Sequence, residues 1–377
     1  MNEGKLNDDY LENKIILDSA PGAEVLIEGK RYNYFAGTGY YELNKNPEIL
    51  RSAAEALTQY GISSSSSRSS YGTTKLILEL EKEAAMFFDA EDSVYLPSGF
   101  LTPSAAIQAL ALKNNFDLIF IDEVTHYSNQ FAAQLTGKQV IRFSHLSSDD
   151  LNGKLRKNLK GNQVPLIITD GIFPVYGKIA PIGAYKNIID KYNGKLWIDE
   201  AHSLGILGNN GKGTTEYFGI NSENIYFGGT LSKAFGGFGG IIPGKKVFID
   251  EIKKGDLFNG ATPAPSPAIA ASLAGIKFVE VHPEKRNRLY SNAKLLKDGL
   301  KQIGIEVEDS VVPIAAWSFG NRNEMQKFVY ELFKSGYIVQ LINYVGSGED
   351  GAVRIVVFET HTQEQIKGLL EQIKKII

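Results

Sequence analysis

Short apolar runs alternate with longer segments of helical spacing through the middle of the chain. Each run is nearly continuous in apolar residues, as expected for a strand that is buried on both faces. The strand-like runs cover residues 93–96, 118–121, 139–143, 165–169, 195–198 and 224–227. Strands of this kind separated by helices predict an α/β fold with a mostly parallel sheet covered by helices on both faces.

Polar residues follow several of these runs. Asp122, Asp170 and Asp199 each close a run, and Ser98 comes shortly after another. In open parallel sheets, ligands bind at the carboxyl ends of the strands. The pattern therefore favours an enzyme over a purely structural protein.

The N-terminal part of the chain has a different pattern. Residues 23–35 predict two short strands joined by a glycine turn, and residues 46–60 predict a helix. A second helix is expected to begin soon after Gly72. Between the two helices, the serine-rich run 63–70 contains Arg68. This run is either a low-complexity segment or an ordered loop that faces a ligand, and the sequence leaves both open.

The last third of the chain predicts an α+β domain. A long helix is expected over residues 268–303, and strands and helices alternate after it. The expected strands cover residues 305–308, 315–318 and 353–357, and the expected helices cover 322–335 and 362–376. We therefore expect an N-terminal arm at 1–45, a large domain that contains the sheet at 46–267 and a small C-terminal domain at 268–377.

Composition excludes several functions. The chain has 43% hydrophobic and 22% charged residues, which is typical of a globular protein, and its formal net charge of −3 gives no basis for nucleic-acid binding. It has no cysteine and no histidine pair at ligand spacing, so we expect no metal site. The polar segment 1–10 does not resemble a signal peptide, and no apolar run reaches membrane-spanning length. We expect a cytoplasmic protein without a transmembrane segment.

A single lysine stands in a glycine-rich stretch after the last of the strand-like runs. Residues 228–240 read GGTLSKAFGGFGG, which places Lys233 among small residues and beside the hydroxyls of Thr230 and Ser232. Burial disfavours the ammonium form of lysine, and the neutral amine forms Schiff bases with carbonyl compounds such as pyridoxal phosphate. The same glycines also suit a flexible loop with a solvated lysine. Taken alone, this stretch leaves both interpretations open.

The stretch WIDEAHSLG at residues 197–205 carries a carboxylate and a histidine. Asp199 ends a strand-like run, and His202 follows three residues later. A carboxylate that faces a pyridine nitrogen keeps this nitrogen protonated, so that the ring accepts electrons, and a nearby histidine can bond to the ring oxygen. An aspartate after a strand can equally cap the next helix.

Two further stretches offer contacts to a phosphorylated ring. Ser98, Gly99 and Phe100 precede a predicted helix, whose first backbone amides could bind a phosphate. His126 follows another strand-like run and could stack on a ring. A single histidine near the end of a strand can also have a purely structural role.

Together and in this order, these motifs resemble the α-oxoamine synthase family of fold type I pyridoxal-phosphate enzymes. The most specific are DEAHSLG from Asp199, GKG from Gly211 and GTLSKAFGGFGG from Gly229. The resemblance extends from about Leu17 to the C-terminus. It implies a fold type I transferase fold, with a seven-stranded, mostly parallel sheet in the large domain and a smaller α+β C-terminal domain.

The resemblance also implies catalytic and cofactor-binding roles. Lys233 would form the Schiff base with pyridoxal 5'-phosphate and act as the base once an amino acid has displaced it. Asp199 would pair with the pyridinium nitrogen, and His202 would bond to the ring hydroxyl. His126 would stack on the ring.

Further positions complete the expected site. The amides of Gly99 and Phe100, with Thr230, would hold the phosphate; their neighbours Ser98 and Ser232 are expected to line the same site. Thr262 resembles the residue that reaches the phosphate in the partner subunit's site, which implies a homodimer. Arg354 matches the arginine expected to bind the carboxylate of the amino acid, a task that suits the guanidinium fork.

Three positions depart from the family pattern. Thr38 stands where the family has a substrate-side asparagine, and Ile77 stands where it has a histidine. Pro174 replaces a serine that would contact the cofactor oxygen. The cofactor motifs are intact, so these changes bear on the substrate and leave the use of an acyl-CoA open.

The leading hypothesis is a pyridoxal-phosphate-dependent acyltransferase that condenses an amino acid with an acyl-CoA or another acyl thioester, usually with decarboxylation. An alternative keeps the cofactor and changes the reaction to amino-group transfer or other carbanion chemistry. A third reading is a non-catalytic subunit that binds a catalytic homologue. The retention of Lys233, Asp199 and His126 argues against this third reading.

Overall fold

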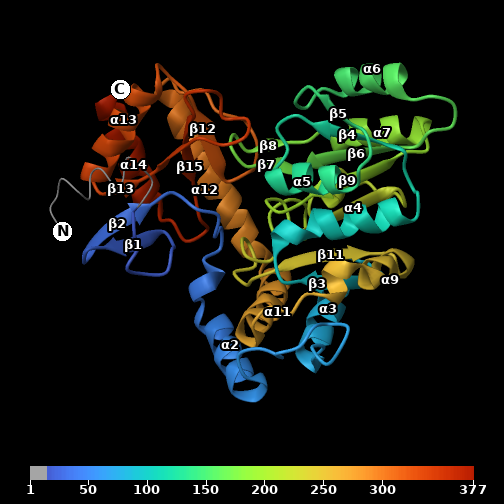
Figure 1. Cartoon of the computed structure of the whole chain (residues 1–377). Coiled ribbons are helices and arrows are strands. Elements are labelled where there is room, and N and C mark those ends of the chain that lie inside the picture. The colour runs from blue at the N-terminus through green and yellow to red at the C-terminus, as the bar shows by residue number, and fades with distance from the viewer. Residues whose placement is uncertain (1–14) are drawn as a thin grey trace. The chain divides into compact units, whose positions relative to one another are not determined.

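The computed structural model describes residues 15–377, so the polar segment 1–10 lies outside the described residues. The chain forms two compact units (Figure 1). One unit comprises residues 46–173 and 179–283; the other comprises 174–178 and 284–377 with the segment up to Lys45. The predicted division places its last boundary after residue 267, whereas the chain passes from one unit to the other after Pro283.

The first unit is built on a seven-stranded sheet of order β3-β11-β10-β9-β6-β4-β5. Its strands are β3 (Asp92–Leu96), β4 (Leu118–Asp122), β5 (Val140–Phe143), β6 (Pro165–Asp170), β9 (Lys195–Asp199), β10 (Ile225–Thr230) and β11 (Gly240–Gly244). The pairs among β10, β9, β6, β4 and β5 are parallel, whereas β11 is antiparallel to both neighbours. This arrangement confirms the predicted fold class.

Alternate residues of the central strands face two different cores. Ile168 and Trp197 belong to one core, together with side chains of α4 (Thr102–Leu112), α5 (Tyr127–Leu135) and α9 (Lys246–Lys254). Ile167 and Ile198 belong to the other core, with α6 (Ser148–Asn158) and α7 (Ile182–Lys191). Both sheet faces are therefore covered by helices, which is why the strands read as continuous apolar runs.

Short elements and helices complete this unit. They are α2 (Pro47–Tyr60), α3 (Lys75–Phe87), η2 (Gly99–Leu101), β7 (Ile172–Phe173), α8 (Thr214–Tyr217), α10 (Asp256–Asn259) and α11 (Ser266–Val281). The two-residue strand β8 (Lys178–Ile179) has one residue in each unit. Helix α11 packs against α2 and α3. Helix α2 begins where the sequence predicts, because the Asn46 side chain accepts from the amides of Glu48 and Ile49 and Pro47 fits the first turn.

The second unit has an α+β arrangement with two small sheets of order β1-β2-β13 and β12-β15-β14. The strands are β1 (Glu24–Ile27), β2 (Lys30–Tyr34), β12 (Ile314–Trp317), β13 (Tyr337–Ile338), β14 (Gln340–Ile342) and β15 (Ala352–Val356). The helical elements are η1 (Leu43–Lys45), α12 (Pro283–Gln302), α13 (Arg322–Lys334) and α14 (Gln363–Ile376). Capping boxes at Asn321 and Thr362 start α13 and α14.

Two predicted elements are wrong. The long helix expected over 268–303 is interrupted at His282, because the following Pro283 disfavours helical backbone at the preceding residue. Residues 305–308 form no strand. Only Ile305 is buried among these four residues, so the short apolar alternation covers no sheet face.

The serine-rich run is an ordered loop. Arg68 makes two hydrogen bonds to Glu81, at 3.0 and 3.1 Å, and both side chains are buried. The guanidinium also lies 4.7 Å from the centre of the Phe258 ring. The backbone amide of Arg68 donates to Ala261, and the Ser69 hydroxyl donates to Asn259. The low-complexity reading of this run is therefore wrong.

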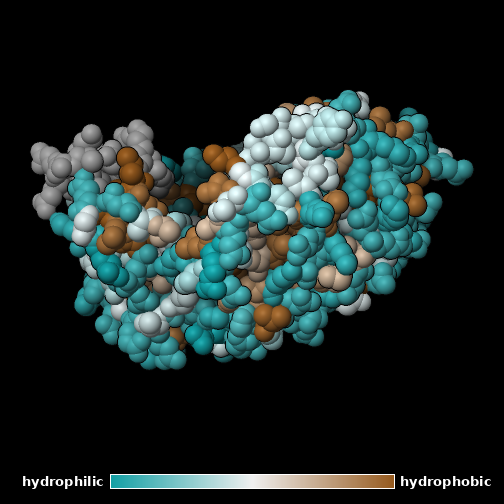
Figure 2. All heavy atoms as spheres, turned by 90° about the horizontal axis from the view of Figure 1, so that it is seen from below, coloured by the Kyte–Doolittle hydropathy of each residue, from teal (hydrophilic) through white to brown (hydrophobic). Residues whose placement is uncertain are grey.

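The surface shown in Figure 2 is mostly hydrophilic, with apolar side chains in small separate groups. Such scattered apolar residues are normal on the surface of a globular protein. Within residues 15–377, none of the helices is long and apolar enough to cross a bilayer.

His361 is a buried histidine of the second unit. Its ring stacks on Phe35 at 4.0 Å between ring centres, and its Nδ1 accepts a 2.8 Å hydrogen bond from the Phe358 amide. Burial lowers the pKa of His361 to about 4, against the weaker opposing effect of Glu42. Since the unfolded residue has a pKa of about 6.5, protonation between pH 6.5 and 4 favours unfolding.

We therefore expect this unit to lose up to about 3 kcal/mol of its free energy of unfolding as the pH falls from 7 to 4. Urea unfolding, followed by circular dichroism at several pH values, measures the loss. The His361→Gln variant should show a shallower pH dependence than the wild type. Equal slopes for the two proteins would contradict the assignment to His361.

Candidate active site

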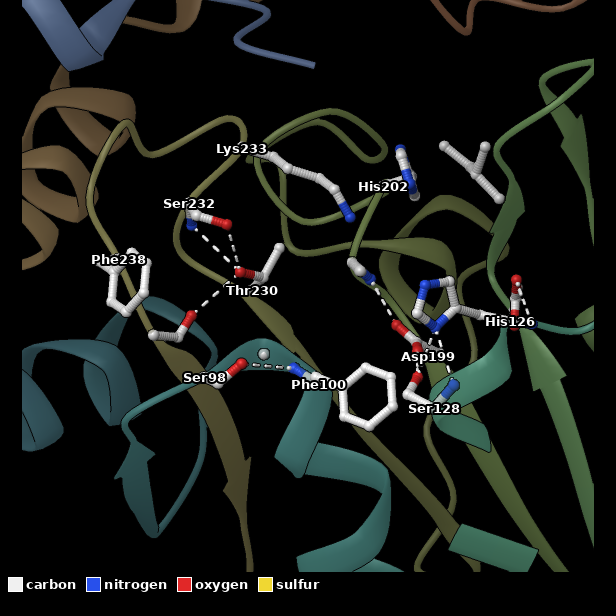
Figure 3. A pocket seen from close by; sticks show the side chains of 15 residues that line it. Ser98, Phe100, His126, Ser128, Asp199, His202, Thr230, Ser232, Lys233 and Phe238 are labelled. Atoms are coloured by element: carbon white, nitrogen blue, oxygen red, sulfur yellow. Dashed lines mark hydrogen bonds between the residues drawn. The ribbon is translucent and has the colours of Figure 1, made fainter. Parts of the chain in front are cut away.

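A cavity of about 190 Å³ opens where five strands of the large sheet end (Figure 3). Residues that follow β3, β4, β6, β9 and β10 contribute to it. Its lining comprises Ser98, Gly99, Phe100, His126, Ser128, Asp170, Ile172, Asp199, Ala201, His202, Thr230, Ser232, Lys233, Phe238 and Gly239. The sheet thus brings together nine of the ten sequence-predicted cofactor residues from four separate segments of the chain, and Thr262 is the tenth.

Lys233 enters this cavity from the loop between β10 and β11. Figure 3 shows its amine pointing toward the side on which Asp199 and His202 lie. Hydrogen bonds within the loop stabilise it: the Thr230 hydroxyl donates to the Gly239 carbonyl at 3.0 Å and lies 2.7 Å from the Ser232 hydroxyl. Lys233 is half-buried in an ordered turn, so the flexible-loop reading is wrong.

Glycine is required at two points of the cavity wall. A Cβ atom at Gly99 would lie 2.5 Å from the Thr230 Cβ. Gly239 has a φ of +93°, and a side chain there would meet the Tyr95 ring. At these two points the backbone packs too closely against Thr230 and Tyr95 to leave room for a side chain.

Ser98 begins the turn that the sequence assigns to a phosphate. Its backbone is extended, and its hydroxyl accepts from the Phe100 amide at 3.2 Å, at the start of η2. Helix α4 continues directly from η2, so the positive end of its dipole lies at this turn.

Asp199 ends β9 and has 6% of its surface exposed. One carboxylate oxygen accepts from the Ala201 amide at 3.0 Å, and the other lies 3.4 Å from the Ser128 hydroxyl. The carboxylate therefore shapes the following turn and lines the cavity at the same time.

His126 is fixed by the first turn of α5, of which it is the N-cap. Its Nδ1 accepts from the Ser128 amide at 3.1 Å and lies 2.6 Å from the Ser128 hydroxyl. The donated amide proton requires Nδ1 to be unprotonated, which leaves the proton of the neutral ring on Nε2. Burial lowers the pKa of His126, an effect that Asp199 opposes and Lys233 reinforces.

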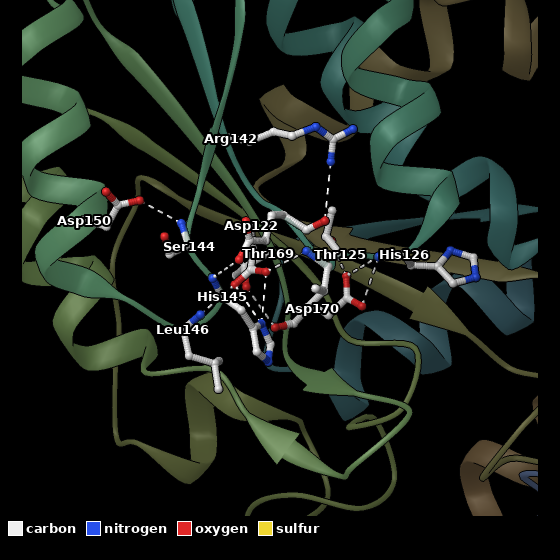
Figure 4. A network of polar contacts seen from close by, with 12 residues as sticks. Asp122, Thr125, His126, Arg142, Ser144, His145, Leu146, Asp150, Thr169 and Asp170 are labelled. Atoms are coloured by element: carbon white, nitrogen blue, oxygen red, sulfur yellow. Dashed lines mark hydrogen bonds and ion pairs between the residues drawn. The ribbon is translucent and has the colours of Figure 1, made fainter. Parts of the chain in front are cut away.

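A buried carboxylate, Asp170, holds the start of α5 in place (Figure 4). It accepts from the Thr125 hydroxyl, from the His126 amide at 3.1 and 3.2 Å, and from Asn129 at 2.9 Å. Burial raises the pKa of Asp170 well above its usual value, and the charge of Asp199 adds to this effect. The Asn129 amide oxygen in turn accepts from the Trp197 indole at 3.0 Å, which ties α5 to β9.

The sequence interpretation missed the roles of Ser128 and Asp170. Ser128 follows His126 by two residues, and this spacing at the start of a helix was a usable signal. Asp170 was recognised as a polar strand end, yet its partners lie more than 40 residues away in the chain.

Thr262, Thr38 and Arg354 do not line this cavity. Thr262 is exposed in the loop after α10. Thr38 and Arg354 belong to the second compact unit, where Arg354 is buried and lies on β15. Burial lowers the pKa of Arg354, whereas the nearby phenols of Tyr40, Tyr34 and Tyr344 act in the opposite direction.

The residues of the cavity fit pyridoxal 5'-phosphate. A lysine amine, a buried carboxylate and a turn at the start of a helix lie around one cavity. These groups match an aldehyde carbon, a ring nitrogen and a phosphate, in that order. Within residues 15–377, clusters of side chains suited to a metal ion are absent. The fold and the site thus define a fold type I pyridoxal-phosphate enzyme.

Comparison with known proteins agrees with this class. Residues 37–373 match the family "Aminotransferase class I and II". The chain is 33% identical to 8-amino-7-oxononanoate synthase of Thermosipho melanesiensis, over 96% of this chain and 92% of the relative. It is 31% identical to 8-amino-7-oxononanoate synthase 1 of Bacillus subtilis, over 95% of this chain and 91% of the relative.

Solved structures show the same fold. A serine palmitoyltransferase from S. paucimobilis superposes with a TM-score of 0.91 at 22% identity, covering 99% of this chain and 96% of the other. An 8-amino-7-oxononanoate synthase from Francisella tularensis superposes with a TM-score of 0.77 at 24% identity. The superposition covers 91% of this chain and 96% of the other.

The chain belongs to the aminotransferase class I and II family and, within it, to the α-oxoamine synthases. It is a pyridoxal-phosphate-dependent acyltransferase that condenses an amino acid with an acyl thioester, with decarboxylation.

Proposed function

We propose that Lys233, Asp199 and His126 carry the condensation, because they face one cavity at the carboxyl edge of the sheet. Lys233 binds the cofactor and, when an amino acid has displaced it, removes the α-proton. Asp199 holds the ring nitrogen in its protonated form, and His126 lies against the ring. When bound, the cofactor would supply an electron-accepting ring that stabilises negative charge on the α-carbon of the amino acid.

The other cavity residues have supporting roles in this proposal. The backbone amides of Gly99 and Phe100, with Thr230, bind the phosphate, and Ser98 and Ser232 support this turn. His202 bonds to the ring hydroxyl. Arg354 binds the carboxylate of the amino acid, and Thr38 stands on the substrate side. The observation that best supports these proposed roles is that Lys233 and Asp199 line the same cavity.

The first product to test is 8-amino-7-oxononanoate, after which the relatives are named. In this product the amino-bearing C8 and the methyl C9 correspond to the carbons that alanine keeps after decarboxylation. The ketone at C7 then comes from a seven-carbon acyl group with a terminal carboxylate. We therefore propose L-alanine and a heptanedioyl thioester, with coenzyme A as the carrier, as the first substrate pair.

Release of free coenzyme A tests this function directly. Because the chain has no cysteine, a thiol reagent reports the released thiol without background from the protein. We expect thiol release with L-alanine and heptanedioyl-CoA, and a smaller rate with L-serine and palmitoyl-CoA. Amino-group transfer to a 2-oxo acid, without thiol release from any acyl-CoA, would overturn the proposal in favour of an aminotransferase.

We also propose a homodimer in the cytoplasm. The exposed position of Thr262 suits contact with the partner subunit's cofactor phosphate. Sedimentation of the active enzyme as a monomer would contradict the dimer.

A further inference from the structure

Arg354 is a buried cation held by two neutral acceptors. Its Nε donates to the carbonyl oxygen of Pro174 at 2.7 Å, and its Nη1 donates to the Oε1 of Gln340 at 3.0 Å. Only 5% of the Arg354 surface is exposed. The acceptor at Pro174 is a backbone carbonyl. A proline at this position, where the family has a serine, therefore still accepts the hydrogen bond from Arg354.

Carboxylates of residues 15–377 do not pair with this guanidinium. The charged and titratable groups near Arg354 are the phenols of Tyr34, Tyr40 and Tyr344. Burial raises the pKa of Tyr40 to about 12 and also raises that of Tyr34, so these phenols are neutral near pH 7. A buried cation without an anion is costly, and a neutral hydrogen-bonding shell lowers this cost without cancelling the charge.

Strand pairing places Gln340 against Arg354. Gln340 is the first residue of β14, and it lies directly opposite Arg354 on the antiparallel strand β15. Directly opposed residues of neighbouring strands point to the same sheet face. On the other side of β15, the opposed residue is Ala316, which is too small to restrict the guanidinium. The sheet register therefore makes Gln340 the side chain that orients Arg354.

We propose that Gln340 is a positioning residue for the amino-acid substrate: it orients the Arg354 guanidinium with a neutral amide and so keeps its charge for the substrate carboxylate. This inference rests on the proposed role of Arg354. A carboxylate at position 340 would pair with Arg354 through the same cross-strand contact and would compete with the substrate for its charge.

The test compares three variants of the full-length, cofactor-loaded enzyme. In Gln340→Glu, the new carboxylate pairs with Arg354. In Gln340→Met, the side-chain length is kept and the acceptor is lost. Gln302→Glu introduces the same charge change at an exposed position of the same unit, at the end of α12, and serves as the control.

The first readout is the dissociation constant of the amino acid, obtained from the absorbance change of the bound cofactor. Glycine, L-alanine and L-serine are the probes. We expect the constant to rise at least about 10-fold in Gln340→Glu, the effect of losing a hydrogen bond to a charged group, and about 3-fold in Gln340→Met. The control should match the wild type.

The second readout separates positioning from general damage. The KM for the amino acid should rise in Gln340→Glu, whereas kcat and the KM for the acyl thioester should change less than about 3-fold. Cofactor affinity and the thermal unfolding midpoint should equal those of the wild type. Unchanged amino-acid affinity in Gln340→Glu, or a loss of cofactor affinity equal to the loss of substrate affinity, would overturn the inference.

Failure of the proposed function gives a different result. Wild-type protein that binds the amino acid but releases no coenzyme A would refute the condensation, while the binding constants would still test Gln340. Wild-type protein that shows no spectral response to any of the twenty amino acids would refute the role of Arg354 and the inference with it.

Discussion

Replacing Lys233 by alanine is expected to lower the rate of condensation by at least about 10³-fold, because the change removes the general base. It also removes the amine that bonds to the cofactor. The purified variant should therefore lack the visible absorbance band of lysine-bound pyridoxal phosphate. Absorbance spectra and thiol release under saturating substrates measure the two effects.

Lys246→Ala is the matched control for this prediction. Lys246 lies in the same compact unit, is mostly exposed and pairs with Asp250 on its own helix. Its loss should leave both the absorbance band and the rate unchanged. Retention of the band in Lys233→Ala would show that another amine binds the cofactor.

Replacing Glu81 by alanine is expected to destabilise the first unit by about 3–5 kcal/mol, because it leaves Arg68 as a buried charge without a partner. The side chains of Arg68 and Glu81 are only 5% and 4% exposed. Glu81 also accepts from the Tyr95 amide at 2.9 Å, so its loss leaves a strand of the large sheet without that bond. Urea unfolding measures the change.

A second pair on the same helix provides the control. Glu79 pairs with Lys277 at 3.2 Å, and its side chain is 56% exposed. Glu79→Ala should lower the free energy of unfolding by less than about 1 kcal/mol, as is usual for the loss of an exposed ion pair. Arg68→Met combined with Glu81→Leu should recover much of the loss, because an apolar pair leaves no buried charge. Equal losses in Glu79→Ala and Glu81→Ala would contradict this account.

The parallel strands and the helices between them could be predicted from the sequence. A strand that is buried on both faces consists of consecutive apolar residues, and such runs are visible in the sequence. Strand β11 was missed. It begins inside the glycine-rich stretch and contains Pro243, both of which argue against a strand. Pro243 is tolerated because it lies beyond the residues of β11 that pair with β10.

The stretch around Lys233 shows how much of the site the sequence could specify. Local motifs predicted site roles for Lys233, Asp199 and His126 one at a time, each with a structural alternative. Their shared position at one sheet edge excluded the flexible-loop alternative for Lys233. The order of the motifs along the chain was enough to predict the cofactor and the class of reaction.

The supporting contacts were decided by the tertiary structure alone. Asp170 meets His126 across 44 residues, Arg68 meets Glu81 across 13, and the sheet register sets Gln340 opposite Arg354. Hydrophobic periodicity and short motifs are local properties, so they predict strands, helices and candidate reactive residues. Which polar groups meet depends on how distant strands pair and which faces they bury, and no local pattern carries that information.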